Sequence, residues 1–186
     1  MEKKFILTDK FVINSFGIKL FQIKCTKSFK YAQKGDFGGY VEKEGNLDQK
    51  NDAWVSGNAR VFGNARVSSN ARVSGDAWVS DNARVSGDAW VSGNAWVSGN
   101  AWVSGDADIE NDNEHCGFDG FGSCNRHTHA YMTKEKKVEI ICGCFRGSIE
   151  EFEKKVEETH SGTVYEKQYK SIINVIKIKF GLTDFT

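Results

Sequence analysis

The chain has 186 residues, and its 25 Lys and Arg residues balance 25 Asp and Glu residues, so the formal net charge is zero. This balance argues against a protein that binds nucleic acid through bulk positive charge. No segment approaches the roughly 20 apolar residues of a membrane span, and the N-terminal sequence lacks the apolar stretch of a signal peptide. We therefore expect a cytoplasmic protein without a membrane partner, whose five cysteines are reduced.

Residues 1–40 are predicted to form a small β cap. The segment "KKFILTD" is typical of one short strand, and "FVINSFGIKLFQIKC" of two strands around a turn at 14–17. A stack of coils needs a cover at its open end, and this module precedes a long repeat. The cap is therefore expected to close the first coil.

Residues 41–110 carry a hexapeptide repeat with the consensus A-x-V-S-G-[N/D]. A-x-V is typical of a short strand whose first and third side chains point inward while the second points outward. S-G-[N/D] is typical of a turn with a positive φ, where Ser69 and Asp81 replace glycine. The residue that opens each unit recurs every six positions: Val41, Leu47, Ala53, Ala59, Ala65, Ala71, Ala77, Ala83, Ala89, Ala95, Ala101 and Ala107.

This repeat resembles that of left-handed parallel β-helix proteins, in which three hexads form one triangular coil. The resemblance covers residues 41–110 and implies about four coils. The expected fold class is mainly β: a left-handed parallel β-helix of about four triangular coils, with a small N-terminal β cap and a C-terminal α+β module.

The middle position of each hexad should point outward, which makes one surface of tryptophan and arginine. This candidate binding surface consists of Trp54, Arg60, Arg66, Arg72, Trp78, Arg84, Trp90, Trp96 and Trp102. Residues eighteen apart should stack at the ~4.8 Å spacing of strands. The three predicted rows are Trp54, Arg72, Trp90 and Asp108; Glu42, Arg60, Trp78 and Trp96; and Asp48, Arg66, Arg84 and Trp102.

Two interpretations of this surface stay open. The rows could be cation–π ladders and ring stacks that only stiffen the coils. They could instead contact a partner, because Trp and Arg dominate interface hot spots and five large rings are more than a monomer normally exposes. The partner would be a second copy of the chain, which would make a homo-oligomer, a host protein, or a flanking module.

The C-terminal part should begin with a loop or linker over 111–130, which is rich in Gly and Asn. Residues 131–186 are predicted to form a β-hairpin followed by two helices. Capping boxes at Ser148 with Glu151, and at Thr163 with Glu166, mark the starts of these helices. We expect a small α+β unit here.

Metal binding is weakly indicated after the repeat. The candidate ligands lack the paired C-x-x-C spacing of strong zinc sites, and burial as small apolar residues is the simpler interpretation of the cysteines. Aspartate and asparagine at the turns are expected to form hydrogen bonds between coils rather than a calcium site. The weak metal candidates are Cys116, Cys124, His127 and His129.

The whole layout resembles a group of phage- and prophage-encoded proteins, through "GDFGGYVEKEGNL", the hexads and "CGCFRGSIEEFEKKVEETH". The resemblance implies a phage context and, if the chain is phage-encoded, the host cytoplasm. It assigns no residue a role. The predicted function is a non-catalytic accessory protein that binds a protein partner through oligomerisation and the Trp/Arg surface, one form being an anti-CRISPR-like inhibitor of host defence.

Three alternatives stay open. Hexapeptide acyltransferases need a histidine base, and all four histidines lie beyond residue 114, so neither this activity nor a cofactor is favoured. A nucleotide-binding sponge would stack a base on Trp beside Arg, although nucleotide or nucleic acid is not the favoured partner. The chain could also be a purely structural virion or scaffold protein.

Overall fold

The computed structural model describes residues 2–182 and divides into two compact units, one up to Asp112 and one from Asn113 onward. The fold is mainly β. The first unit holds a small N-terminal strand region and a β-solenoid of about four turns, and the second holds a four-stranded sheet and two helices. The expected fold class is confirmed at this level, whereas the handedness of the coils stays a prediction.

The N-terminal strands β1 (Phe5–Ile13), β2 (Lys19–Cys25) and β3 (Phe37–Val41) form an antiparallel group. β1 covers both segments that the sequence assigned to separate strands, with an irregularity in register between Leu7 and Phe11. The predicted turn at 14–17 is present, and the Asn14 side chain accepts hydrogen bonds from the backbone N–H groups of Phe16 and Ile18.

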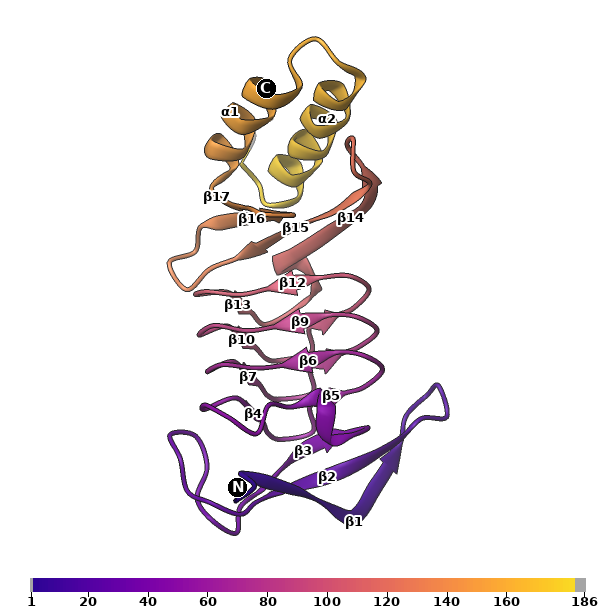
Figure 1. Cartoon of the computed structure of the whole chain (residues 1–186), viewed down its shortest axis with the longest axis vertical. Coiled ribbons are helices and arrows are strands. Elements are labelled where there is room, and N and C mark those ends of the chain that lie inside the picture. Colours follow the sequence, from indigo (N-terminus) through magenta and orange to yellow (C-terminus); the bar gives the residue numbers. More distant parts are fainter. Residues whose placement is uncertain (1, 183–186) are drawn as a thin grey trace. The chain divides into compact units, whose positions relative to one another are not determined.

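The solenoid strands are two residues long and stack in three parallel rows (Figure 1). Each coil donates backbone hydrogen bonds to the next, as from Trp54 N to Ala71 O at 3.0 Å. Short strands gain stability only through such stacking. The strands are β4 (Trp54–Val55), β5 (Arg60–Val61), β6 (Arg66–Val67), β7 (Arg72–Val73), β8 (Trp78–Val79), β9 (Arg84–Val85), β10 (Trp90–Val91), β11 (Trp96–Val97), β12 (Trp102–Val103) and β13 (Asp108–Ile109).

The interior of the solenoid is built from the alanine and valine positions of the hexads. Every alanine from Ala53 to Ala107 that opens a hexad is buried, as is the valine two positions later, or Ile109 in the last hexad. In register, Val79 lies between Val61 and Val97, so identical side chains stack along the axis. The predicted inward direction of these positions is confirmed.

The turns adopt the left-handed backbone conformation that the repeat requires. The glycine position has a positive φ in each regular turn, and the two replacements adopt it as well, at 59° for Ser69 and 58° for Asp81. A residue with a Cβ is strained at such a φ, whereas glycine is not.

Replacing Ser69 with glycine is expected to stabilise the protein by about 1 kcal/mol, because it removes this strain. Ser74→Gly is the matched control at a hexad serine outside the positive-φ set, and it should destabilise or leave stability unchanged. Urea denaturation of both variants provides the measurement. A Ser69→Gly protein less stable than the original would show that the serine side chain matters more than the backbone conformation.

The first two hexads are out of phase with the sequence prediction. Val41 pairs with Val61 and Leu47 with Val67, twenty residues apart rather than eighteen. The residue that stacks with Arg60 is therefore Tyr40, and the prediction that Glu42 and Asp48 begin two rows is wrong.

The shift arises after Leu47, because Leu47 and Val55 are eight residues apart, whereas Val41 and Leu47 keep the six-residue spacing with a 3-10 helix, Glu44–Asn46, between them. The buried Asn46 amide donates to the carbonyls of Gly63 and Ala65, at 3.2 and 2.8 Å. Glu42 turns its carboxylate to the Gly63 backbone N–H, at 2.6 Å. These polar contacts fix an irregular start, and regular hexads begin at Ala53.

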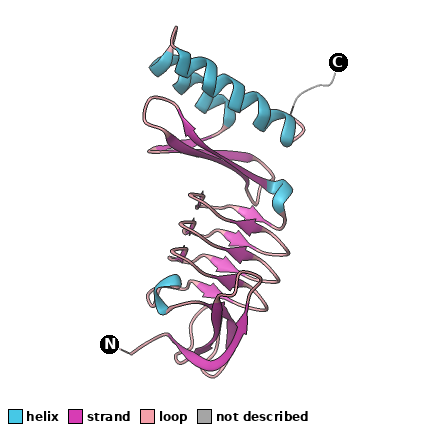
Figure 2. Cartoon of the chain, turned by 90° about the vertical axis from the view of Figure 1, so that its right-hand side faces the viewer, coloured by secondary structure: helices cyan, strands magenta, loops and turns pink. Residues whose placement is uncertain are grey.

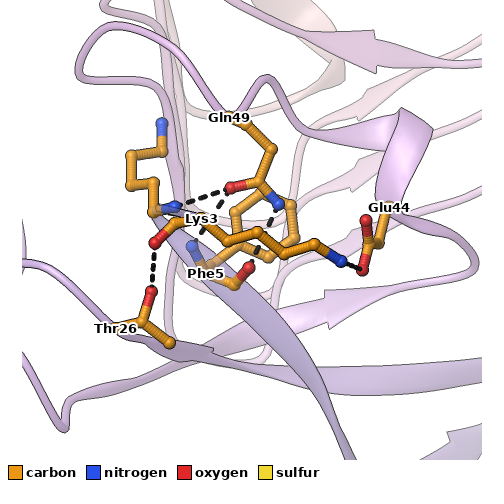
Figure 3. A network of polar contacts seen from close by, with 6 residues as sticks. Lys3, Phe5, Thr26, Glu44 and Gln49 are labelled. Carbon is orange, nitrogen blue, oxygen red and sulfur yellow. Dashed lines mark hydrogen bonds and ion pairs between the residues drawn. The ribbon is translucent and has the colours of Figure 1, made fainter. Parts of the chain in front are cut away.

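A polar network ties the N-terminal segment to this irregular coil (Figure 3). The Gln49 amide accepts from the backbone N–H groups of Lys4 and Phe5 and donates to the Phe5 carbonyl, as a neighbouring strand would. Lys3 pairs with Glu44 at 2.6 Å, and Thr26 donates to the Lys3 carbonyl. The Gln49 side chain thus supplies the hydrogen-bond partners of the Lys4 and Phe5 backbone groups at the edge of the sheet.

The Lys4 side chain is buried, and its amine donates to the carbonyls of Asn51 and Ala53, at 3.1 and 2.7 Å. Burial lowers the pKa of its amine to about 8, with Asp48 and Asp52 opposing the shift. In the unfolded chain the amine stays protonated to a higher pH, so the unfolded state binds more protons between about pH 8 and 10.5.

The contribution of Lys4 to stability is therefore expected to rise with pH across that window, by about 2 kcal/mol. Lys4→Met cannot titrate and should lack this increment. The measurement is the free energy of unfolding of both proteins at pH 7.5, 9 and 10. Other groups titrate equally in the two proteins, so their effect cancels when the free energy of the variant is subtracted from that of the original. Parallel pH curves for the two proteins would contradict the assignment.

The second unit contains β14 (His115–Phe121), β15 (Arg126–Met132), β16 (Val138–Cys142) and β17 (Phe145–Gly147), paired antiparallel in that order. The prediction of a loop over 111–130 is wrong, because β14 and most of β15 form a hairpin there. Positive φ angles at Gly122 and Asn125 make the connection tight, and Gly120 adopts one at the irregularity in the register of β14. Cys116, Phe118 and Phe121 also supply an apolar face to the core.

Helices α1 (Ile149–His160) and α2 (Val164–Lys179) pack side by side against one face of this sheet (Figure 2). The predicted capping box at Ser148 is present, because its hydroxyl accepts from the Glu151 backbone N–H and the Glu151 carboxylate accepts from the Ser148 N–H. At Thr163 only the N-cap half is present: the hydroxyl accepts from the Glu166 N–H, but the Glu166 carboxylate accepts from Gly162 instead. Neither helix in the described part of the chain is long and apolar enough to cross a membrane.

Candidate functional site

The three rows of outward side chains differ in how much they expose. We name each row by its strands. The first face is the row on β4, β7, β10 and β13, and the second face is the row on β5, β8 and β11. The third face is the row on β6, β9 and β12. Trp54 is 4% exposed, whereas Trp96 and Trp102 are 42% and 43% exposed. The five tryptophans therefore do not form one uniform surface.

The first face is partly covered by the N-terminal segment. Phe29 packs edge-on against Trp54, with ring centroids 5.4 Å apart. The Arg72 guanidinium lies 4.1 Å from the Trp90 ring and 5.1 Å from the Tyr31 ring. A hollow of about 220 Å³ remains there, lined by Tyr31, Trp54, Ser56, Arg72, Ser74 and Trp90.

The second face carries an aromatic cluster. Phe16, from the β1–β2 turn, lies within 6.2 Å of the rings of Phe62, Trp78 and Trp96. The Trp96 indole N–H donates to the Ser80 hydroxyl at 3.1 Å, which fixes the ring, and Arg60 stacks over Trp78 at 5.1 Å. The cation–π ladder expected from the sequence is thus present on the first and second faces.

The third face presents its side chains differently. Arg66 and Arg84 are exposed and lie directly above one another as paired residues of β6 and β9. Trp102 follows in the next coil, paired with Arg84. Within residues 2–182, no ion pair or ring contact involves Arg66 or Arg84. Two like charges are therefore stacked in register beside an exposed indole, an arrangement that costs stability in isolation.

The corners between the faces carry the hydrogen bonds expected from the sequence. Asn70 donates to Asp88 at 3.1 Å, and Asn58 donates to Asp76 at 3.1 Å, each across one coil. Asn82 links to Asn100 in the same way, at 3.3 Å. These ladders join successive coils and keep the outward rows in register.

Of the four weak metal candidates, only His127 and His129 lie close together, with ring centroids 5.7 Å apart. Cys116 pairs with Ala130 on the face of the sheet that packs against the helices, whereas His127 and His129 point to the opposite face. Burial raises the pKa of the Cys116 thiol to about 11, which disfavours the thiolate that a metal needs. Cys124 is exposed in the β14–β15 turn. In the described part of the chain, no three His, Cys, Asp or Glu side chains are arranged to hold a metal.

The contacts of Phe16, Phe29 and Tyr31 with the Trp/Arg surface were not predicted from the sequence. These residues follow no period, and they reach the solenoid only because β3 joins β5 in one sheet. The one signal available in the sequence was that these large aromatic residues lie in segments that form turns before the repeat. A large aromatic residue in an exposed turn is unusual and indicates that its ring packs against another part of the protein.

The solenoid is similar to the family described as YdcK beta solenoid repeat, which matches residues 53–69, 65–81, 77–93 and 89–105. These matches begin where the regular hexads begin. No curated protein matches the chain. The matched repeats and the stacked parallel coils together make this chain a β-helix protein.

Proposed function

We propose that this chain is a non-catalytic binding protein that docks an acidic surface of a partner protein along its third face. One observation carries the proposal: Arg66, Arg84 and Trp102 form a single exposed row, and the two arginines form no ion pair within residues 2–182. Arg and Trp are residues that most often dominate the energy of a protein interface.

The electrostatics of the row favour a partner that carries carboxylates. Stacked guanidinium groups repel each other in the free protein, and a carboxylate placed between them would remove that repulsion. Arg binds a carboxylate through two parallel hydrogen bonds, which gives direction as well as attraction. The net charge of the whole chain is zero, so this attraction is local to the row.

The solenoid also holds the row rigidly. The three residues belong to strands paired in register, at the ~4.8 Å spacing of a sheet. A surface that is already ordered loses little conformational entropy when it binds. Rigidity and complementary charge are together sufficient for a specific interface without any catalytic group.

In the phage context that the resemblance suggests, the partner would be a protein of a host defence system, and docking would block it. Self-association is the second form of the proposal, because the aromatic cluster of the second face leaves Phe16 and Trp96 exposed. Light scattering at micromolar concentration distinguishes the two: a strict monomer rules out the homo-oligomer and leaves the docking proposal intact.

Quantitative co-purification from a bacterial lysate tests the docking proposal. The bait is compared with Arg66→Ala/Arg84→Ala/Trp102→Ala and with the control Lys154→Ala/Lys167→Ala/Ile178→Ala, which also removes two exposed cations and one exposed apolar side chain. We expect an acidic protein to be lost from the first variant only, in nuclease-treated lysate. Equal recovery from both variants would refute the proposal.

A further inference from the structure

The second unit contains a cavity of about 460 Å³ between the ends of its sheet strands and helix α1, with Tyr169 of α2 on its wall. Its volume lies within the range of small-molecule sites. The floor is apolar and includes Phe152 and Val156, which belong to the buried core. This cavity is distinct from the Trp/Arg surface of the solenoid, with which it shares no residue.

The charge around the cavity has one sign. Arg126, Arg146 and Lys155 line it together with His160, and no carboxylate does. Two of these cations have acidic partners nearby, since Arg146 pairs with Glu139 at 2.7 Å and Lys155 with Glu158 at 3.5 Å. Within residues 2–182, Arg126 forms no ion pair.

The exposed Arg126 side chain lies over Gly143, in the turn between β16 and β17. Its guanidinium carbon lies 3.0 Å from the position that a Cβ would occupy on Gly143, and its Cδ lies 2.8 Å away. Gly143 has a φ of 60°, a backbone conformation that favours glycine, and the missing side chain leaves space that the Arg126 side chain occupies. The "CGC" turn therefore makes room for a cation at the cavity.

The aromatic wall of the cavity is ordered. The rings of His160 and Tyr169 are stacked, with centroids 5.5 Å apart and planes inclined by 26°. Phe145 and Phe152 are 5.0 Å apart on another side. Burial raises the pKa of the Tyr169 hydroxyl, so this group remains a neutral donor, with the Cys142 sulfur 3.7 Å away. Flat rings beside cations favour a flat anion.

We propose that this cavity binds a small aromatic anion, in which a planar ring carries a phosphate or carboxylate group. The ring would lie against the wall formed by His160 and Tyr169, and the anionic group would meet Arg126 and Lys155. A nucleoside monophosphate and an aromatic carboxylic acid share this chemistry, and the choice of probes distinguishes them. The site is independent of the docking face proposed above.

Calorimetric titration of the full chain tests the proposal with AMP and 4-hydroxyphenylacetate as anionic aromatic probes. Adenosine, 4-hydroxybenzyl alcohol and inorganic phosphate serve as the matched compounds that lack the charge or the ring. We expect one anionic aromatic probe to bind with a Kd below about 1 mM and at least about tenfold more tightly than its neutral analogue. Equal binding of the neutral analogue, binding of phosphate alone, or no binding of either anionic probe would overturn it.

Variants assign the binding to this cavity. Arg126→Gln is expected to weaken binding of the probe about tenfold or more, whereas Lys154→Gln, which removes a neighbouring charge on α1 outside the cavity, should not. Unchanged binding by Arg126→Gln would overturn the proposal. Circular dichroism of each variant first establishes that α1 and α2 are intact.

Alkylation of Cys144 provides a second readout that requires no probe. This thiol is exposed and lines the cavity. The quantity measured is the ratio of the alkylation rate by anionic iodoacetate to the rate by neutral iodoacetamide. Nearby cations should make this ratio higher for Cys144 than for a thiol on an uncharged peptide. Arg126→Gln should lower the ratio. A ratio insensitive to Arg126→Gln would contradict the cationic site.

Discussion

Reversing both charges of the third face, Arg66→Glu with Arg84→Glu, is expected to weaken binding of the captured partner by at least about a hundredfold. Each arginine that meets a carboxylate contributes a charge-assisted hydrogen bond, and reversal replaces this attraction with repulsion. The two side chains are exposed, so the change should leave the fold and the packing of the core intact. Surface plasmon resonance with the purified partner gives both the Kd and the association rate.

The salt dependence of that binding provides the control. Binding by the unchanged protein should weaken between about 50 and 500 mM salt, mainly through a slower association rate. The reversal variant should show a flat or inverted dependence. A Kd that is insensitive to both salt and charge reversal would mean that the partner binds elsewhere, with the aromatic cluster of the second face as the next candidate.

Replacing Val79 with aspartate is expected to prevent the solenoid from folding. Val79 is fully buried between Val61 and Val97, and an isolated carboxylate there has no partner in a column of methyl groups. The cost should exceed about 4 kcal/mol, a large share of the stability of an ordinary domain. Val79→Ala should cost about 2 kcal/mol, because it leaves only a cavity.

Asn94→Asp is the matched control for that variant, since it introduces the same charge on an exposed turn of the neighbouring coil. Far-UV circular dichroism and urea denaturation give the comparison. A Val79→Asp protein as stable as Asn94→Asp would show that the column of valines does not hold the coils together.

The regular part of the solenoid could be predicted from sequence because its rule is local. From Ala53 to Ile109 every hexad repeats one strand and one turn, so direction, burial and stacking partner follow from the count of residues. The first coil could not be predicted in this way. Its register depends on the buried amide of Asn46 and on Glu42, each of which contacts a backbone group about twenty residues away.

The hairpin of β14 and β15 was missed for a related reason. Glycine and asparagine indicate a loop, yet here they make one tight turn, and the pairing partner and the helices supply the stability. In residues 115–132, packing against the rest of the unit therefore outweighs the loop propensity of the glycine and asparagine residues. The two helices were predicted because their caps are local signals at Ser148 and Thr163.

The outward direction of the Trp/Arg surface was predictable, but its accessibility was not. Phe16, Phe29 and Tyr31 reach the first and second faces through contacts that no periodicity reveals. These contacts also bear on the nucleotide alternative. Arg60 and Arg72 already lie on the rings of Trp78 and Trp90, where a base would have to stack. The third face therefore carries the proposal.

Site-specific photo-cross-linking tests the docking face most directly. Trp102 is replaced by p-benzoylphenylalanine in the full chain, and the same residue at Phe16 reports on the second face. We expect irradiation in lysate to link position 102, and not position 16, to one acidic protein, with the link lost when Arg66→Glu and Arg84→Glu are added. Cross-linking from position 16 alone, or a link from position 102 that survives the charge reversal, would contradict the docking of a partner on the third face.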